Sequence, residues 1–216
     1  RPGAGVVAPV PKVGVFGGSF NPIHFGHLLL ADEICEALAF DRVLFVPAAV
    51  PPHKPAAELA SAEHRYRMTE LAVSLHPRFA VSDVELRRRG PSYTVDTLHA
   101  LRGEGDLHLL IGSETFLELL SWREPREVAR LARLVVVPRT GANFEPGAPA
   151  AQLVLRELGL SAFGSADGPV LFRAASLPIS GSDLRRRARD LRSLAYRMPE
   201  PVAAYIREHR LYRSAP

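Results

Sequence analysis

The sequence predicts an α/β fold built on a doubly wound parallel sheet, followed by a helical C-terminal segment. Short apolar, β-branched runs recur along the chain, and segments with apolar residues at helical spacing lie between them. Strands that alternate with helices indicate a parallel sheet with right-handed crossovers. The chain has 216 residues, of which 47% are hydrophobic and 23% are charged, so it can bury the core of such a Rossmann-like domain.

The first half of the chain is expected to contribute four strands and three helices. Apolar runs predict strands at 13–16, 43–46, 79–84 and 107–111, and helical spacing predicts helices at 28–38, 66–75 and 95–101. Cys35 suits the buried face of the first helix. Ser61 is a suitable N-cap for the second helix, with Glu63 and His64 in its first turn.

The second half continues the alternation and then becomes helical. We expect strands at 134–137 and 170–174, and helices at 128–131, 151–158, 182–194 and 202–211. The stretch 140–168 is rich in Gly, Ala and Pro, which is typical of a surface insertion. We therefore expect a flexible leader at 1–11 and a single domain at 12–216, whose helical C-terminal part spans 180–216.

Composition and charge exclude several classes of protein. A single cysteine, Cys35, rules out an internal disulfide framework and a multi-cysteine zinc site. No run approaches the roughly 18 consecutive apolar residues of a membrane span, and the N-terminus does not resemble a signal peptide. We therefore expect a cytoplasmic protein without a membrane partner. The net charge of +4 favours anionic ligands in general.

The stretch 17–27, GGSFNPIHFGH, places a glycine pair and two histidines directly after the first expected strand. Ligands of open parallel sheets bind where the strands lead into helices. We expect Gly17 and Gly18 to let the backbone bend sharply and approach a phosphate, beside the N–H groups of a helix start. His24 and His27 are three residues apart, so both imidazoles can address one ligand. The alternatives are a metal site and simple capping or packing histidines.

This pattern resembles the HxGH nucleotidyltransferases, which move an adenylyl or cytidylyl group from ATP or CTP to a phosphate. Ser19 and Asn21 stand where Thr and Asp are the commoner residues of that family. The resemblance implies a phosphate-binding set of Gly17, Gly18, Ser19 and Phe20. A related histidine signature occurs in class I aminoacyl-tRNA synthetases, so the motif indicates the chemistry better than the substrate.

A proline-braced loop after the second expected strand carries His53 and Lys54, which are candidates to face the same phosphates. Only two of the 27 basic residues are lysines, Lys12 and Lys54, and 27 − 2 leaves 25 arginines. This pattern favours a need for a compact ammonium group at Lys54. Codon usage and a plain surface turn are the alternative explanations.

A serine-rich helix start, PISGSDLRRR, is the third candidate for phosphate binding. Ser180 precedes a helix, and Asp183 follows three residues later as in a capping box. Backbone donors of the helix start and the guanidinium fork of Arg185 are suited to a phosphate. A simple N-cap on an exposed basic helix explains the same residues.

Together, segments along nearly the whole chain resemble the bacterial nicotinate-nucleotide adenylyltransferases, a family that makes deamido-NAD from nicotinate mononucleotide and ATP. The segments are GGSFNPIHFGH, VPPHK, HRYRMTELA, ELRRRGPSYTVDTL, LLIGSETFLELLSW, LVVVPR, PISGSDLRRR and MPEPVAAYIREHRLY. The pantetheine-phosphate adenylyltransferases share the first motif and a related serine motif, but they are shorter and lack GPSYTVDTL.

Matched position by position, this resemblance implies roles for residues of several loops. The implied catalytic set is His24, His27, Lys54 and Arg185, and Ser180 and Ser182 join Arg185 in holding the departing pyrophosphate. The implied pyridine-nucleotide set is Tyr93, Thr94, Gly112, Glu114 and Trp122. Trp122, the single tryptophan, is expected to stack on the pyridine ring, since a flat aromatic ring suits an aromatic face. Core packing is its alternative role.

The chain departs from the family pattern at two places. Gly112-Ser113-Glu114 stands where Gly-Ala-Asp is common, and the longer Glu114 can still accept hydrogen bonds from a ribose, with a different reach. Gly181 and Ser182 follow Ser180 where the family often has Ser or Thr and then Thr. This change removes one side-chain hydroxyl and leaves backbone donation at Gly181.

The resemblance implies ATP and nicotinate mononucleotide as small-molecule partners and Mg²⁺ as the cofactor, carried mainly by the triphosphate without protein ligands. Nicotinamide mononucleotide and phosphopantetheine are alternative acceptors. A nucleic-acid-binding module that uses the basic run at 185–189 is the alternative from another class. We expect no nucleic-acid partner, because aromatic residues form only 7% of the chain and do not interleave with this run. The sequence does not decide between a monomer and a homo-oligomer.

Overall fold

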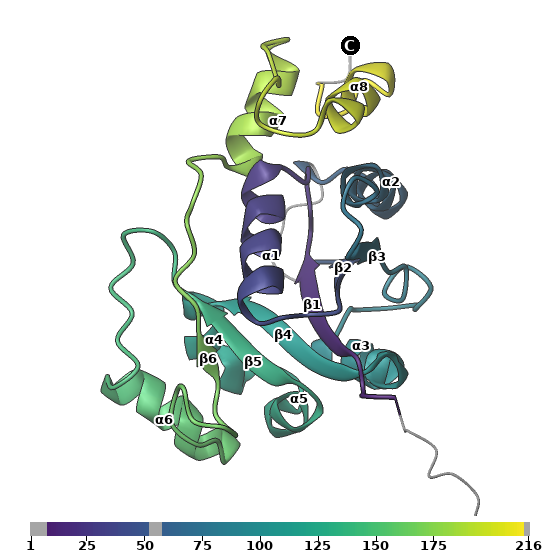
Figure 1. Cartoon of the computed structure of the whole chain (residues 1–216). Helices are drawn as coiled ribbons and strands as arrows, with labels where there is room; N and C mark the ends of the chain where they lie inside the picture. Colours follow the sequence, from purple (N-terminus) through teal and green to yellow (C-terminus); the bar gives the residue numbers. More distant parts are fainter. Residues whose placement is uncertain (1–7, 52–57, 214–216) are drawn as a thin grey trace, which may run out of the picture.

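Six parallel strands form one sheet in the order β3-β2-β1-β4-β5-β6, as seen in a computed structural model that describes residues 8–51 and 58–213 (Figure 1). The strands are β1 (Lys12–Gly18), β2 (Arg42–Pro47), β3 (Phe79–Val81), β4 (Asp106–Gly112), β5 (Arg133–Val137) and β6 (Val170–Leu171). The strand order is that of the doubly wound dinucleotide-binding folds. The predicted Rossmann-like α/β class is confirmed.

The strand order reverses at β1, which pairs with β2 on one side and with β4 on the other. Val15 lies opposite Leu44 in β2 and opposite Leu109 in β4. Chains of this topology open a crevice beyond the carboxyl ends of the two central strands. Gly18 and Gly112 both lie three residues beyond the paired Val15 and Leu109, so the two candidate loops leave the sheet side by side.

Helices and short 3₁₀ turns connect the strands. The helices are α1 (Phe25–Ala37), α2 (Ala62–Val73), α3 (Thr94–Leu101), α4 (Ser113–Leu117), α5 (Pro125–Leu131), α6 (Pro149–Leu158), α7 (Gly181–Arg189) and α8 (Glu200–Glu208). The 3₁₀ turns are η2 (Arg102–Glu104) and η3 (Leu119–Ser121). Within the described residues, no helix has the length and apolar character of a membrane span.

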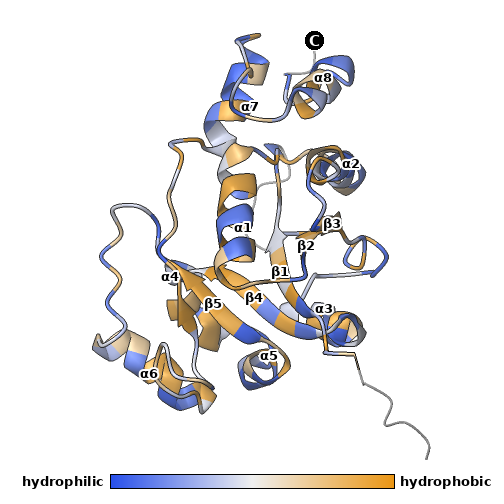
Figure 2. Ribbon diagram, viewed as in Figure 1, coloured by the Kyte–Doolittle hydropathy of each residue, from blue (hydrophilic) through white to orange (hydrophobic). Residues whose placement is uncertain are grey.

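Two apolar clusters lie on opposite faces of the sheet, because alternate side chains of each strand point to opposite faces. Val15 belongs to the cluster that contains residues of α3, α4, α5 and α6. Phe45 belongs to the cluster that contains residues of α1, α2, α7 and α8, including the buried Cys35. Figure 2 shows β4 and β5 as mainly hydrophobic ribbons between the two helical layers.

Several expected boundaries were wrong. The helix expected at 182–194 ends at Arg189, because Leu191 adopts a left-handed conformation with φ of 53° and is exposed. The strands expected at 79–84 and 170–174 end at Val81 and Leu171. Apolar periodicity marks where side chains are buried, and it does not mark where backbone pairing stops.

The segment at 140–168 supplies core as well as surface. Helix α6 has an αL C-cap at Gly159, with φ of 68°. Phe144, together with Val154 and Leu155 of α6, is buried in the same cluster as α3 and α5. This segment therefore forms part of one helical layer of the domain.

Candidate active site

Two helix N-termini meet beyond the end of β1. His24 is the N-cap of α1 and Ser180 is the N-cap of α7. A methyl group added to Gly181 would lie 3.2 Å from the carbonyl oxygen of Asn21, and one added to Gly26 would lie 3.9 Å from that of Ile179. Figure 1 shows α7 above the start of α1. Because helix starts carry unpaired N–H groups and positive partial charge, this junction is suited to an anion.

The two histidines of the first motif stack on each other and cap α1. Their ring centroids are 3.8 Å apart with an interplanar angle of 28°. The N–H of Gly26 donates to Nδ1 of His24 over 3.0 Å, and the N–H of His24 donates to Nδ1 of His27 over 3.2 Å. Since the Nδ1 atom of each ring accepts a hydrogen bond, we assign a proton of each ring to Nε2. Each ring therefore has Nε2 as its hydrogen-bond donor.

Burial keeps His24 neutral. The His24 side chain is buried, and the loss of hydration on burial lowers its pKa from 6.5 to about 4. An imidazole in this state offers a hydrogen-bond donor at neutral pH without a full positive charge. The capping interpretation and the functional interpretation of this histidine are thus compatible, because the same backbone contact that caps the helix fixes the tautomer.

The stretch Gly17–Phe20 has a different geometry from the expected one. We expected Gly17 and Gly18 to bend the chain, but both belong to β1, and neither has a positive φ. The left-handed residue is Phe20, with φ of 45°. Its ring is buried and packs edge-on against His27 at 5.2 Å, so only its backbone can face a ligand. Gly17 meets no side chain within 4 Å of an added methyl group, which leaves the backbone open to close approach.

The serine-rich start of α7 lies beside Arg185. The Oγ of Ser180 accepts the N–H of Asp183 over 3.2 Å, which confirms the predicted N-cap, and lies 3.3 Å from Oγ of Ser182. Arg185 donates from Nη1 to the carbonyl oxygen of Asn21 over 2.9 Å. The structure therefore brings Ser180, Ser182 and Arg185 to the same junction as the histidine pair.

Asn21 is a centre of contacts that the sequence did not reveal. Its amide nitrogen donates to the carbonyl oxygen of Glu58 over 2.9 Å. Its amide oxygen accepts from the N–H of Ala60 over 3.1 Å and from the hydroxyl of Tyr212 over 2.8 Å. A carboxylate has no donor for the Glu58 carbonyl, so this network explains an asparagine where the family commonly has aspartate.

Arg65 is a second residue that sequence reasoning missed. It is fully buried in α2, and its guanidinium donates to the carbonyl oxygens of Ser19, Ala49 and Ala60 over 2.8, 3.1 and 2.9 Å. It thereby ties together the loops that follow β1 and β2. The available signal was its position, because Arg65 lies at helical spacing with the buried Met68.

Two of the candidate pyridine-nucleotide segments meet at a second place. Tyr93 precedes α3, Thr94 begins it, and the guanidinium carbon of Arg123 lies 4.8 Å from the Tyr93 ring centroid. Arg123 follows Trp122, so this contact links the two segments. Trp122 is half-buried and packs against the core cluster, which agrees with core packing, the alternative role expected for it. Sequence reasoning did not single out Arg123.

The end of β4 carries two more of the candidate pyridine-nucleotide residues. Gly112 is the last residue of β4 and the N-cap of α4, and Glu114 lies in the first turn of α4. The Glu114 carboxylate is exposed and lies 3.5 Å from Nη1 of Arg139. Its longer side chain is therefore directed to a salt bridge with the segment that follows β5.

Glu85 is a buried acid near the start of α3. Burial raises its pKa from 4.5 to about 7. Hydrogen bonds from Ser92 and Thr97, and the charges of Arg88 and Arg65, act in the opposite direction and are outweighed by burial. Ser92 directly precedes Tyr93, so this hydrogen bond adjoins the candidate pyridine segment.

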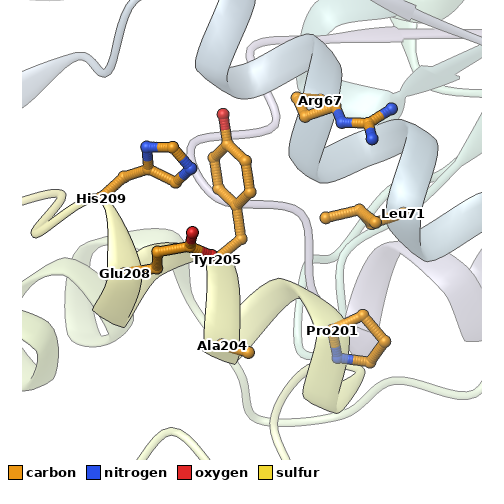
Figure 3. A pocket seen from close by; sticks show the side chains of 7 residues that line it. All are labelled: Arg67, Leu71, Pro201, Ala204, Tyr205, Glu208 and His209. Carbon is orange, nitrogen blue, oxygen red and sulfur yellow. The ribbon is translucent and has the colours of Figure 1, made fainter.

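The remaining predicted residues, His53 and Lys54, lie outside the described residues. A groove of about 520 Å³ lies between α2 and α8, where Tyr205 points between Arg67 and His209 (Figure 3). None of the residues that line this groove belongs to the predicted site, so the groove is separate from that site.

Comparisons with known proteins agree with this geometry. The family model described as cytidylyltransferase-like matches residues 15–187. A protein of Thermus thermophilus named "Probable nicotinate-nucleotide adenylyltransferase" is 43% identical over 94% of this chain and all of its own length. A protein of Geotalea uraniireducens with the same name is 41% identical over 94% of this chain and 99% of its own.

Solved structures support the fold. Nicotinic acid mononucleotide adenylyltransferase of Plasmodium falciparum, solved in complex with NaAD, superposes with a TM-score of 0.70 at 18% identity. The match covers 94% of this chain and 97% of that one. From the family model and the full-length relatives, the chain belongs to the cytidylyltransferase-like family and, within it, to the nicotinate-nucleotide adenylyltransferases.

Proposed function

We propose that this protein transfers the adenylyl group of ATP to nicotinate mononucleotide, which gives deamido-NAD and pyrophosphate. The observation that carries the proposal is the histidine pair. Two stacked imidazoles, each with a backbone N–H on Nδ1, stand where the starts of α1 and α7 meet. Full-length relatives that bear this activity in their names support the choice of acceptor.

In this mechanism, a phosphate oxygen of nicotinate mononucleotide attacks the α-phosphorus of ATP in line, and the bond to the bridging oxygen of pyrophosphate breaks. The nucleophile arrives ionised, so no general base or covalent intermediate is required. Catalysis then consists of positioning and of donors aimed at oxygens whose negative charge grows in the transition state. His24 and His27 supply such donors from Nε2, and Arg185 with Ser180 and Ser182 holds the leaving end.

Mg²⁺ is proposed to enter as the complex of ATP. Among residues 8–51 and 58–213, no group of three or more His, Cys, Asp or Glu side chains could hold a metal ion. These residues do not fit a resident metal centre, and no step is assigned to one. We expect turnover to require added Mg²⁺ and to stop in excess chelator, and full activity in chelator would contradict this expectation.

The candidate pyridine site is proposed to select the acceptor. The end of β4, which carries Gly112 and leads to Glu114, lies beside β1, whose end leads to the histidine pair, and this neighbourhood supports the proposal. We propose that Trp122 stacks on the pyridine ring and that the acceptor phosphate points to the histidine pair.

A panel of acceptors tests the proposal. Nicotinate mononucleotide, its amide and phosphopantetheine are each offered with ATP and Mg²⁺, and pyrophosphate release is followed. We expect the highest kcat/KM with nicotinate mononucleotide. Release with phosphopantetheine alone would refute the acceptor, and salt-dependent binding of RNA without ATP turnover would favour a nucleic-acid-binding protein.

A further inference from the structure

The guanidinium of Arg185 already holds an anion that belongs to the protein. Its Nη2 lies 3.2 Å from Oε2 of Glu58, and its Nη1 donates to the carbonyl oxygen of Asn21. The Nε of Arg185 is buried and has no hydrogen-bond partner among the described residues. The Glu58 carboxylate therefore pairs with Nη2 of the guanidinium, and the neighbouring Nε donor has no acceptor among the described residues.

This ion pair is a built contact. The side chain of Asn21 binds the chain on both sides of residue 59, through the carbonyl oxygen of Glu58 and the N–H of Ala60. The hydroxyl of Tyr212 fixes the orientation of the same amide. Since Asn21 also accepts from Arg185 through its backbone, one residue anchors both partners of the pair.

The pair stands at the place that suits a phosphate. A methyl group on Gly181, in the first turn of α7, would lie 3.2 Å from Nη1 of Arg185. A phosphate group can accept from Nε and Nη2 of one arginine side by side, and such paired contacts are the strong form of this interaction. Glu58 accepts from Nη2 alone and is mostly exposed, so a phosphate can compete with its carboxylate for this N–H group.

We propose that Glu58 is an affinity-determining residue whose carboxylate occupies Arg185 until the phosphate chain of the nucleotide displaces it. This inference rests on the role of Arg185 in the proposed function. The carboxylate pairs with a partly buried cation, and each incoming phosphate must break that contact. Glu58 thus weakens the binding of ATP and pyrophosphate to the resting protein.

Three single variants test the inference by equilibrium binding of ATP and of pyrophosphate, measured by calorimetry without an acceptor. Glu58→Gln removes the charge, and Glu58→Asp keeps the charge on a side chain that is one methylene shorter. Glu63→Gln is the matched control, since Glu63 is an exposed acid in the first turn of α2. Thermal unfolding of each variant verifies that it is folded.

We expect Glu58→Gln to bind both ligands about two- to fivefold more tightly, the range for an ion pair with an exposed partner. Glu58→Asp should shift in the same direction, and Glu63→Gln should match the wild type. Unchanged or weaker binding by Glu58→Gln would overturn the inference, because Glu58 would then be inert or would position Arg185. Wild-type affinity in Glu58→Asp together with tighter binding in Glu58→Gln would also overturn it. The negative charge at position 58 would then act over a distance, without the contact with Arg185. A different acceptor in the activity panel leaves this result unaffected.

Discussion

Gly26→Ala is the most direct test of the histidine geometry. In the native structure, Gly26 lies under the His24 ring and donates its N–H to Nδ1 over 3.0 Å. A methyl group at this position would lie 2.8 Å from Cε1 and 2.9 Å from Nδ1 of His24. Contacts this short are not tolerated, so the ring has to turn away, and the tautomer is then no longer fixed by the backbone.

The expected magnitude separates catalysis from stability. Loss of one preorganised donor lowers kcat by roughly 10²- to 10³-fold. The free energy of unfolding should change little, because alanine replaces glycine in a helix with a gain of about 1 kcal/mol. The lost capping contact costs about the same amount. Gly26→Ala should therefore unfold near the wild-type temperature and turn over very slowly.

Steady-state pyrophosphate release at saturating ATP and acceptor measures kcat, and calorimetry measures unfolding. Gly103→Ala is the matched control, because Gly103 is exposed in η2 and an added methyl group meets nothing within 4 Å. A kcat of Gly26→Ala within about threefold of the wild type would refute the role assigned to the His24 ring. A threefold change corresponds to a change of about 0.7 kcal/mol in the activation free energy.

Three further changes probe the buried groups and the pyridine site. The pKa of Glu85 rises from 4.5 to about 7 on folding, so its contribution to stability is present below pH 4.5 and is lost as the pH rises through 7. Glu85→Gln should remove this loss of roughly 3 kcal/mol, measured by denaturant unfolding at pH 5 and pH 8. The pKa of His24 falls from 6.5 to about 4, so its contribution is present above pH 6.5 and is lost as the pH falls through 4. His24→Asn, which keeps a capping side chain, should unfold with less acid sensitivity, and an unchanged acid slope would contradict the assigned pKa. Trp122→Leu, which keeps an apolar but smaller side chain, should raise KM for nicotinate mononucleotide about three- to tenfold through loss of ring stacking and leave KM for ATP unchanged. Equal changes in both KM values would indicate that Trp122 serves only the core.

The sequence was sufficient for the parallel sheet and for the histidine pair because both depend on local pattern. Buried β-branched runs mark the strands, and the spacing of His24 and His27 places them on one helix start whatever the rest of the chain does. The position of the pair at the crevice followed from topology, since the first strand of such a sheet ends at the switch point. The contacts of Ser180 followed from capping chemistry.

The contacts that hold the site could not be predicted in the same way. Asn21 meets Glu58 and Tyr212, which are 37 and 191 residues away along the chain. Nothing in the local sequence distinguishes a buried guanidinium with three backbone acceptors, as at Arg65, from an ordinary exposed arginine. The expected bend at the glycine pair also failed for a tertiary reason, because both glycines are held in the sheet by pairing with β2.

Arg65 and Arg185 neutralise carbonyl groups of the loop that is proposed to face the phosphates. The carbonyl oxygen of Gly18 accepts from the N–H of Ala48, that of Ser19 accepts from Arg65, and that of Asn21 accepts from Arg185. Each of these dipoles is directed toward a protein donor, so its negative end is partly neutralised before a ligand arrives. Repulsion between these oxygens and an anion is reduced, while the N–H groups at the helix starts keep their favourable field. Under the proposed function, the buried Arg65 is therefore expected to support phosphate binding indirectly, by orienting the backbone of this loop.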